Sequence, residues 1–427
     1  MELHLKGMFE MKNIKSVLFL LIFQLLVLPR AHSGEWKQFY SLNTPRAGAS
    51  SVVLDGKIYV LGGKTINNKV LNTVECFDPG QGMWIENALP PFETERYNAA
   101  AVVFNGKIFL IGGRSSKEIL EDVEVFDPVQ NSWKHVQNIH EGREGHVAFI
   151  MNERIYIIGG QENEYELIKK IEWYDEANDE WEEEKEKCPF PRVAAFGAGL
   201  NNIFYMFGGY YYGMNNEGYK WDKNAMHKSW ESLPSLSEAR AYGATVVKGD
   251  SLFLIGGETA TGKSGTVEIF NTKTEALSSG TPLPAPRSGL TGVCLNDTIY
   301  VIGGYDNNTE NPLNSVEIFV ETTTGLENNS NYSLPRSKIL INGYPNPFNG
   351  QISLEVELPK LASYRLDIYN LRGQHVKSLF NGLAAGGKKY FKWYGNDEHG
   401  KAVSSGVYWL VVRSSDVRAS FKIIYVR

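Results

Sequence analysis

Residues 96–113 read RYNAAAVVFNGKIFLIGG, and this stretch decides the fold because its plan recurs along the chain. Six apolar runs end in a Gly-Gly doublet, at intervals of 47 to 50 residues, and an arginine stands 16 residues before each doublet. The doublets are Gly62-Gly63, Gly112-Gly113, Gly159-Gly160, Gly208-Gly209, Gly256-Gly257 and Gly303-Gly304, and the arginines are Arg46, Arg96, Arg143, Arg192, Arg240 and Arg287. Copies at one fixed phase indicate a repeat architecture.

Each doublet is followed by a further strand, carrying Val-Glu or a close equivalent in five units, and then by a large apolar residue near the start of a fourth strand. The residues at this outer position are Trp84, Trp133, Trp181, Trp230, Leu277 and Leu326, and the fourth unit departs most from the pattern. The inner strands are apolar at consecutive positions, as expected for sheets packed on both faces. The sequence therefore predicts an all-β fold, a six-bladed β-propeller, with the glycines where backbones crowd and the tryptophans filling the gaps between blades.

The N-terminal segment is expected to close the ring. Trp36 and the residues after it, 36–42, precede Arg46 as a fourth strand precedes each later arginine, yet no earlier strands exist for them to join. We therefore assign them to the sixth blade and the propeller to residues 34–325. A competing strand, residues 326–334, is rich in Asn and Ser, and we interpret 326–336 as a linker.

The combined pattern of Arg, Gly-Gly, Val-Glu-x-Phe-Asp-Pro and Trp resembles the kelch repeat. Its best copies are VECFDPGQGMW at residues 74–84 and VEVFDPVQNSW at residues 123–133, and the resemblance covers about residues 36–326. It implies a kelch-type propeller. The last two units lack both the tryptophan and the Asp-Pro turn, which weakens their outer packing without changing the number of blades.

Residues 1–33 have the pattern of a cleaved signal peptide. Lys12 and Lys15 precede the apolar run 17–28, and small residues at Ala31 and Ser33 fit a peptidase site. An uncleaved anchor is the alternative. Since no other segment reaches about 18 consecutive apolar residues, we expect no transmembrane helix in the mature chain.

Residues 337–427 alternate between apolar and polar positions, with turns at Gly373, Gly382, Gly400 and Gly406, which predicts a small Ig-like antiparallel β-sandwich. The order of motifs resembles the C-terminal sorting domains of type IX secretion substrates and the related Ig-like domain of flagellar hook-capping proteins. The residues that carry this resemblance are Asn346-Pro347-Phe348, Leu371-Arg372-Gly373-Gln374, Trp393, Gly400, Ser405-Gly406-Val407-Tyr408, Lys422 and Arg427. It implies secretion machinery as a partner and a secreted or outer-membrane location in a Gram-negative-type bacterium, reached through the periplasm. A plain adhesive module is the alternative.

The six arginines are the candidate ligand-binding residues, because their fixed phase places them at equivalent points of six blades, near the central channel. Guanidinium groups could bind acidic side chains or carboxylated glycans through bidentate pairs. Alternatively, the recurring glutamates or backbone carbonyls neutralise them. Arg46 and Arg287, framed by small residues, are expected to be the most open. Tyr210, Tyr211 and Tyr212, with Tyr219 and Trp221, could form an aromatic cluster that stacks on sugars, or one that packs internally.

Several chemistries find little support. A net charge of -6 argues against nucleic acid as a partner. Cys76, Cys188 and Cys294 lie too far apart for a metal motif and are interpreted as buried thiols without a disulfide. The run Asp306-Asn307-Asn308 with Glu310 lacks the spacing of a calcium loop and is interpreted as a turn. We predict no metal, no cofactor and no catalytic residue.

These observations favour an exported, monomeric binding module that recognises a glycan or a protein through the propeller face. Two alternatives stay open. One is a sialic-acid mutarotase, because a periplasmic family with that activity is also a kelch propeller and would use a channel glutamate with an arginine for proton transfer. The other is a structural adhesin in which the propeller acts as a spacer.

Overall fold

The computed structural model describes residues 34–79, 83–163, 166–225, 229–308, 311–321, 339–358, 362–384, 387–414 and 418–427. They form two compact units, a larger one whose described part ends at residue 321 and a smaller one that begins at residue 339. The predicted signal peptide and linker lie outside the described residues, as does Leu326.

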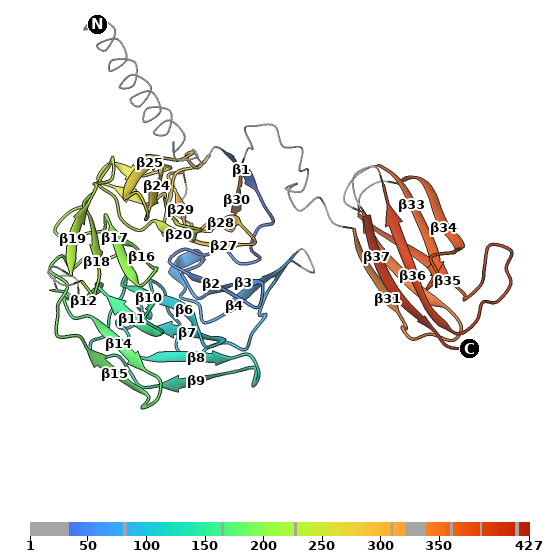
Figure 1. Cartoon of the computed structure of the whole chain (residues 1–427), viewed down its shortest axis with the longest axis horizontal. Helices are drawn as coiled ribbons and strands as arrows, with labels where there is room; N and C mark the ends of the chain where they lie inside the picture. Colours follow the sequence, from blue (N-terminus) through green and yellow to red (C-terminus); the bar gives the residue numbers. More distant parts are fainter. Residues whose placement is uncertain are drawn as a thin grey trace, which may run out of the picture. The chain divides into compact units, whose positions relative to one another are not determined.

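The larger unit consists of six four-stranded antiparallel sheets, which Figure 1 shows in chain order around a central axis. From the axis outward, the first three blades contain β2 (Ser50–Leu54), β3 (Lys57–Leu61), β4 (Val74–Asp78) and β5 (Met83–Ile85); β6 (Ala100–Phe104), β7 (Lys107–Ile111), β8 (Val123–Asp127) and β9 (Ser132–Val136); and β10 (Val147–Met151), β11 (Arg154–Ile158), β14 (Glu172–Asp175) and β15 (Glu180–Glu183). The last three contain β16 (Phe196–Leu200), β17 (Ile203–Phe207), β18 (Gly218–Trp221) and β19 (Trp230–Leu233); β20 (Ala244–Lys248), β21 (Ser251–Ile255), β24 (Val267–Asn271) and β25 (Ala276–Ser279); and β27 (Thr291–Leu295), β28 (Thr298–Ile302), β30 (Val316–Glu321) and β1 (Gly34–Gln38). The all-β fold with six blades is as predicted.

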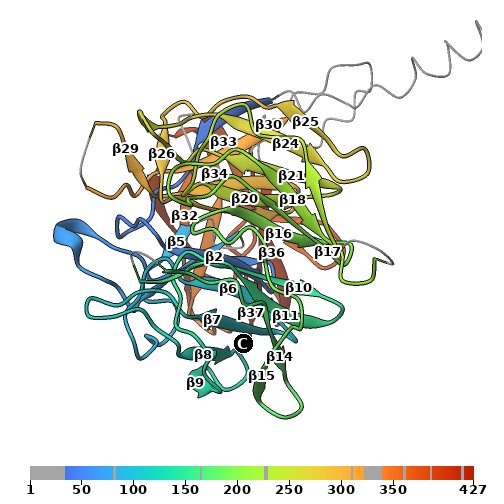
Figure 2. The same cartoon turned by 90° about the vertical axis from the view of Figure 1, so that its left-hand side faces the viewer.

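Short elements lie in the connections between the blade strands, and all except β26, which precedes the first strand of the sixth blade, follow a glycine doublet. They are the 3-10 turn η1 (Ile66–Asn68) and the strand pairs β12 (Gln161–Asn163) with β13 (Glu166–Leu167), β22 (Glu258–Thr259) with β23 (Gly262–Lys263), and β26 (Arg287–Ser288) with β29 (Tyr305–Asp306). Figure 2 shows the β26–β29 pair standing out on one side of the propeller.

The N-terminal strand completes the sixth blade. β1 pairs antiparallel with β30, with Trp36 opposite Phe319, and the two rings lie 5.1 Å apart between centroids. The Trp36 indole N–H donates to the carbonyl of Thr281, at 2.8 Å, which ties the strand to the fifth blade as well. This strand ends at Gln38, whereas the sequence analysis extended the closing segment to residue 42.

The Gly-Gly doublets lie where neighbouring blades meet. The N–H of Gly63 donates to the carbonyl of Arg96 in the next blade, at 2.8 Å, and a Cβ on Gly62 would lie 2.4 Å from that oxygen. The same contact recurs around the ring and ends with Gly304 donating to Arg46, at 2.8 Å. The crowding expected at these glycines is therefore backbone crowding between blades.

The outer tryptophans also join neighbouring blades. The indole N–H groups of Trp84, Trp133 and Trp181 each donate to a carbonyl in the segment that leads from the preceding blade into their own, at 2.8 to 3.0 Å. The fourth blade differs, because Trp221 is fully buried there and donates to Glu186, while Trp230 stacks on Trp221 and its own indole nitrogen is buried without a described partner.

The smaller unit is a β-sandwich of a three-stranded and a four-stranded antiparallel sheet. The first contains, in order, β31 (Leu340–Tyr344), β32 (Ile352–Leu358) and β35 (Gly387–Trp393), and the second contains β34 (His375–Ala384), β33 (Ala362–Asn370), β36 (Gly406–Arg413) and β37 (Arg418–Tyr425). Its core is built around Trp393, which packs against Phe348 and Tyr408. The predicted alternation of apolar and polar residues produces this core.

Candidate ligand site at the channel mouth

The six repeat arginines lie inside their blades. Arg46 is representative: its guanidinium group donates to the carbonyls of Gly62 and Thr73, at 3.0 and 2.9 Å, and pairs with Glu75 at 3.2 Å. Both members of this pair are at most 1% exposed. The arginine thus joins the end of the second strand to the start of the third, and burial lowers its pKa against the opposing effect of Glu75.

The other five arginines repeat this arrangement. Each donates to the carbonyl of the first glycine of its own doublet and pairs with a carboxylate near the third strand; the partners are Glu124, Glu172, Glu217, Glu268 and Glu317. In the fourth blade Tyr219 occupies the usual place of the glutamate, so Glu217 supplies the carboxylate instead.

The expectation that Arg46 and Arg287 are the most open is wrong, because both are at most 2% exposed. All six side chains are at most 4% exposed and turn into their own blades. The physical reason is that each guanidinium group is the internal donor for orphan carbonyls at the end of a strand. The arginines are therefore neutralised by glutamates and backbone carbonyls, which was the alternative in the sequence analysis, and in this conformation they cannot reach a ligand.

A closed ring of backbone hydrogen bonds surrounds the channel, and each of its members lies two residues after a repeat arginine. Each N–H donates to the equivalent carbonyl of the preceding blade, at 2.7 to 3.0 Å. The six members are Gly48, Asn98, Gly145, Ala194, Tyr242 and Gly289, and all have positive φ angles. This hexameric ring divides the channel into a mouth on one side and an inner part on the other.

The mouth is a pocket of about 160 Å³ that rests on this ring. Its walls come from four blades and include Lys64, Tyr97, Tyr242, Glu258 and Tyr305. Several of these residues directly follow a glycine doublet, a position held around the ring by Lys64, Arg114, Gln161, Tyr210, Glu258 and Tyr305. All six are polar or aromatic, so the repeat phase contained a signal for this site that the sequence analysis missed.

The pocket carries one cation and one carboxylate that have no ion-pair partner among the described residues. The Lys64 ammonium lies over the ring of Tyr97, 3.8 Å from its centroid. The Glu258 carboxylate accepts one hydrogen bond, from Ser288 Oγ at 3.2 Å. Both groups are only partly buried, and they are therefore free to contact a ligand.

Tyr242 is the most unusual residue of the mouth. Its φ of 57° is a left-handed conformation that a bulky side chain rarely adopts. Burial and the charges of Glu144 and Glu258 raise the pKa of its hydroxyl group to about 12, so it stays protonated. The same left-handed conformation recurs at the other five members of the ring, so it belongs to the repeat, and what distinguishes Tyr242 is its side chain in the pocket wall.

A glutamate–arginine pair adjoins the pocket. Arg114 donates to Glu144 Oε1 at 2.8 Å, and the pocket residue Asn98 donates to Oε2 of the same carboxylate at 3.0 Å. Glu144 is 5% exposed. The sequence analysis could not identify such a pair.

The tyrosines of the fourth blade do not form one cluster. Tyr210, Tyr211 and Tyr212 are 41%, 47% and 84% exposed, whereas Tyr219 and Trp221 are buried. Tyr210 follows a doublet and is close enough to Tyr242 to affect its pKa, so it belongs to the rim of the mouth. Tyr211 and Tyr212 contact one another beyond it, with ring centroids 4.6 Å apart.

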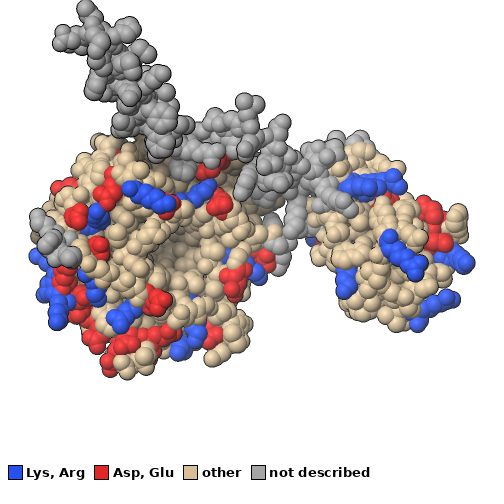
Figure 3. Space-filling view, viewed as in Figure 1, with Lys and Arg blue, Asp and Glu red and all other residues tan. Residues whose placement is uncertain are grey.

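The inner channel below the hexameric ring is lined largely by small residues, and Figure 3 shows a hollow of mostly uncharged surface at the centre of the propeller. The exception is His146, at the position held in other blades by alanine, glycine or leucine. It is 7% exposed, and neither ring nitrogen has a hydrogen-bond partner among the described residues. Burial, and then the charge of Arg143, lower its pKa to about 3.

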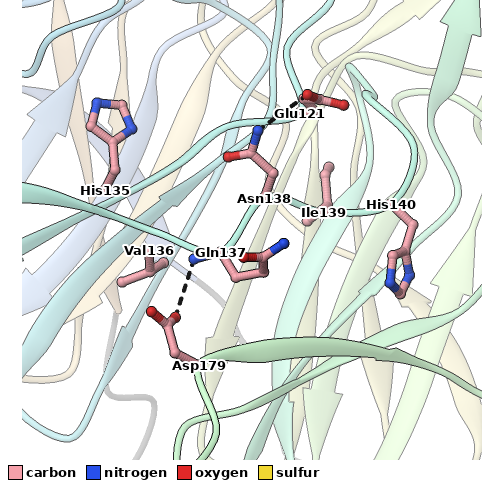
Figure 4. Close-up of a pocket in the computed structure, with 8 residues that line it drawn as sticks. All are labelled: Glu121, His135, Val136, Gln137, Asn138, Ile139, His140 and Asp179. Carbon is pink, nitrogen blue, oxygen red and sulfur yellow. Dashed lines mark hydrogen bonds between the residues drawn. The ribbon is translucent and has the colours of Figure 1, made fainter.

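A wider hollow of about 610 Å³ lies on the outer surface of the second and third blades (Figure 4). Its polar groups are already paired: Asn138 donates to Glu121, the Gln137 N–H donates to Asp179, and His140 contacts Glu172. We therefore favour the mouth as the ligand site.

Metal and thiol chemistry have no visible site in the described part of the chain. No group of three or more His, Cys, Asp or Glu side chains is arranged there to hold a metal ion. Cys76 and Cys188 are buried thiols, and burial raises the pKa of Cys188 to about 12. Cys294 is only half-buried, which corrects its predicted burial. None of the helices formed by described residues has the length and apolar character needed to cross a membrane.

Models of known families match the two parts of the chain that the fold separates, the propeller and the C-terminal sandwich. Residues 25–200 match the KLHDC2/KLHL20/DRC7 Kelch-repeats domain, residues 286–323 match the Kelch motif, and residues 345–417 match the FlgD Ig-like domain. These matches support kelch repeats and an Ig-like domain.

Individual relatives are distant. Beta-scruin from Limulus polyphemus is 27% identical over 202 residues, covering 44% of this chain and 22% of its own length. Kelch-like protein 26 from Danio rerio is 24% identical over 271 residues, covering 60% of this chain and 44% of its own length. The chain therefore spans less than half of these relatives.

Among solved structures, that of YjhT has a similar fold, with a TM-score of 0.57 and 16% sequence identity over 65% of this chain and 95% of that one. Together, the repeats, the ring and the family matches show that this chain contains a kelch-repeat β-propeller followed by an FlgD-type Ig-like domain.

Proposed function

We propose that the propeller is a binding module that holds a glycan residue, or a polar side chain of a protein, in the channel mouth. The observation that carries the proposal is the pocket itself: tyrosine rings, one free cation and one free carboxylate converge from four blades on a floor of backbone hydrogen bonds. Aromatic walls with a few fixed polar groups are typical of sites for small polar ligands.

The size of the pocket favours a sugar over a whole protein surface. A volume of about 160 Å³ admits a single small group, which a glycan end presents readily. The ring of exposed loops around the mouth could then contact the rest of the ligand.

The test is a glycan array and a pull-down with the full mature chain, comparing the parent with Glu258→Gln and Tyr97→Ala. We expect both variants to lose binding by tenfold or more, because Glu258→Gln removes the carboxylate charge of the pocket and Tyr97→Ala removes one of its aromatic walls. Lys134→Gln, a substitution on the outer strand β9, is the control and should bind as the parent does. Equal binding by all four proteins would contradict the proposal.

A second candidate is a sugar mutarotase, and the observation that favours it is the Arg114–Glu144 pair beside the pocket. A carboxylate can accept the proton of the anomeric hydroxyl group as the bond between the anomeric carbon and the ring oxygen breaks, and then return the proton to the ring oxygen, while the arginine stabilises the charge. The assay is the rate of mutarotation of N-acetylneuraminate, which Glu144→Gln should reduce at least tenfold if the chain is such an enzyme. If the parent chain does not accelerate mutarotation, the enzyme candidate is rejected and only the binding function remains.

Export is a further part of the proposal. The signal-peptide pattern of residues 1–33 and the motifs of residues 337–427 support secretion to the cell surface by way of the periplasm. Removing residues 337–427 should trap the protein in the periplasm, as cell fractionation would show. Unchanged surface delivery would favour a plain adhesive domain.

A further inference from the structure

The outer face of the three-stranded sheet in the smaller unit carries exposed tyrosines around a lysine. The strand register places Tyr344, Ser353 and Lys392 in one row across β31, β32 and β35. The next row contains Asn342, Glu355 and Tyr390. Since side chains two residues apart on a strand share a face, both rows point the same way.

The aromatic rings on this face are open to solvent. Tyr344 is 82% exposed and Tyr390 is 70% exposed. Tyr394, which follows the buried core residue Trp393, is 55% exposed. Exposed aromatic rings that share one face of a sheet favour an interaction site there.

Lys392 is the free charge of the face. It lies between Tyr390 and Tyr394 along the chain, and no described carboxylate pairs with it. The other lysine of the face, Lys388, is neutralised by Glu355 at 2.8 Å. Glu357 lies opposite Lys388, so the remaining acidic group is at the far end of the sheet from Lys392.

The charge of the unit points to an acidic partner. Residues 339–427 contain 12 Lys and Arg against 6 Asp and Glu, a net charge of +6, whereas residues 34–321 contain 25 against 40, a net charge of -15. In Figure 3 the visible face of the smaller unit shows more Lys and Arg than Asp and Glu.

We propose that this tyrosine–lysine face binds an acidic polysaccharide. Tyrosine rings spaced along a flat sheet stack on successive sugar rings, and Lys392 pairs with a carboxylate or sulfate group of the strand. Neighbouring strands lie about 4.8 Å apart, so Tyr344 and Lys392 span roughly 10 Å, about the length of two sugar units. The proposal concerns a second site and does not depend on the channel mouth.

The experiment measures binding of the full chain to immobilised polygalacturonate, chondroitin sulfate and neutral dextran. Polygalacturonate supplies carboxylates and chondroitin sulfate adds sulfates, so the two acidic polymers distinguish the preferred anion. We expect the parent to bind at least one acidic polymer, and the Tyr390→Ala/Tyr394→Ala and Lys392→Gln variants to bind it at least tenfold more weakly. Dextran should bind much more weakly than the acidic polymer that the parent prefers.

The matched controls lie on the opposite sheet, where exposed Trp409 on β36 faces Lys422 on β37. Trp409→Ala and Lys422→Gln should stay within twofold of the parent, and circular dichroism verifies that every variant is folded. Lys134→Gln, on strand β9 of the propeller, should also bind as the parent does.

Four results would overturn the proposal. Two concern the variants: unchanged binding by the tyrosine and lysine variants, or equal loss in the opposite-sheet controls. Two concern the parent chain: no binding to either acidic polymer, or equally strong binding to dextran.

Discussion

Arg46 shows at the residue scale why the repeat needs an arginine. Its guanidinium group is buried with the carboxylate of Glu75, which also accepts the backbone N–H groups of Asn43 and Thr44. Arg46→Met should lower the free energy of unfolding by about 3–5 kcal/mol, because it strands a buried carboxylate. Urea unfolding followed by tryptophan fluorescence measures the change. The double variant Arg46→Met/Glu75→Met should recover part of the loss, and a single variant as stable as the parent would show that the pair contributes little.

His146 makes a prediction about pH. Its pKa is lowered from 6.5 to about 3 in the folded chain, so the unfolded state binds the proton more readily. Stability should therefore fall as the pH drops from about 6.5 toward 3, by up to about 1.4 kcal/mol per pH unit from this residue.

The control for this effect is His146→Leu, because the equivalent position of the sixth blade is a leucine, Leu290. Urea unfolding between pH 7 and pH 4 should give a shallower loss of stability for the variant than for the parent. Identical pH profiles would mean that His146 finds a proton acceptor in the folded state.

At the scale of elements, substitutions at two glycines of the first blade distinguish the cost of a left-handed backbone from the cost of a steric clash. Gly62 directly follows β3, has a φ of 61°, and a Cβ added to it would clash with the carbonyl of Arg96. Gly56 lies in the β2–β3 turn with a φ of 71°, and a Cβ added there would meet no atom within 4 Å. Gly56→Ala should cost roughly 1–2 kcal/mol, because alanine must then adopt a left-handed conformation. Gly62→Ala should cost clearly more, as thermal and urea unfolding would show, and equal costs would contradict the assigned blade-to-blade contact.

The strands and blades were predictable because the same packing contacts recur in every blade. The doublets, the arginines and the tryptophans each perform one local task, so one phase fixed the blade count, and Trp36 indicated the closing strand. The mouth was harder to find, because the residues after the doublets are all polar or aromatic but differ in type from blade to blade, so their shared phase was missed. Burial of Arg46 and Arg287 depended on the third strand, whose carboxylates lie about 30 residues further along the chain.

The whole propeller depends on closure between its ends. Each blade contacts only its neighbours, so the sixth and first blades must be joined for every blade to be covered on both faces. Three kinds of contact provide this join: the β1–β30 pairing, the Gly304 bond to Arg46, and the bond of Gly48 to Gly289 in the hexameric ring. Opening the ring should therefore destabilise more than the sixth blade.

Trp36→Ala tests this closure, because it removes a ring that is 9% exposed and donates to Thr281. We expect a loss of about 3–5 kcal/mol, as for other buried tryptophans. Hydrogen exchange should speed up at Gly48 and Gly304 first and then across the other blades, since a ring opened at one seam exposes both ends. Lys37→Ala changes an outward-facing neighbour on the same strand and should leave exchange unaltered. Faster exchange confined to β30 would mean that the remaining five blades hold together without the closing strand.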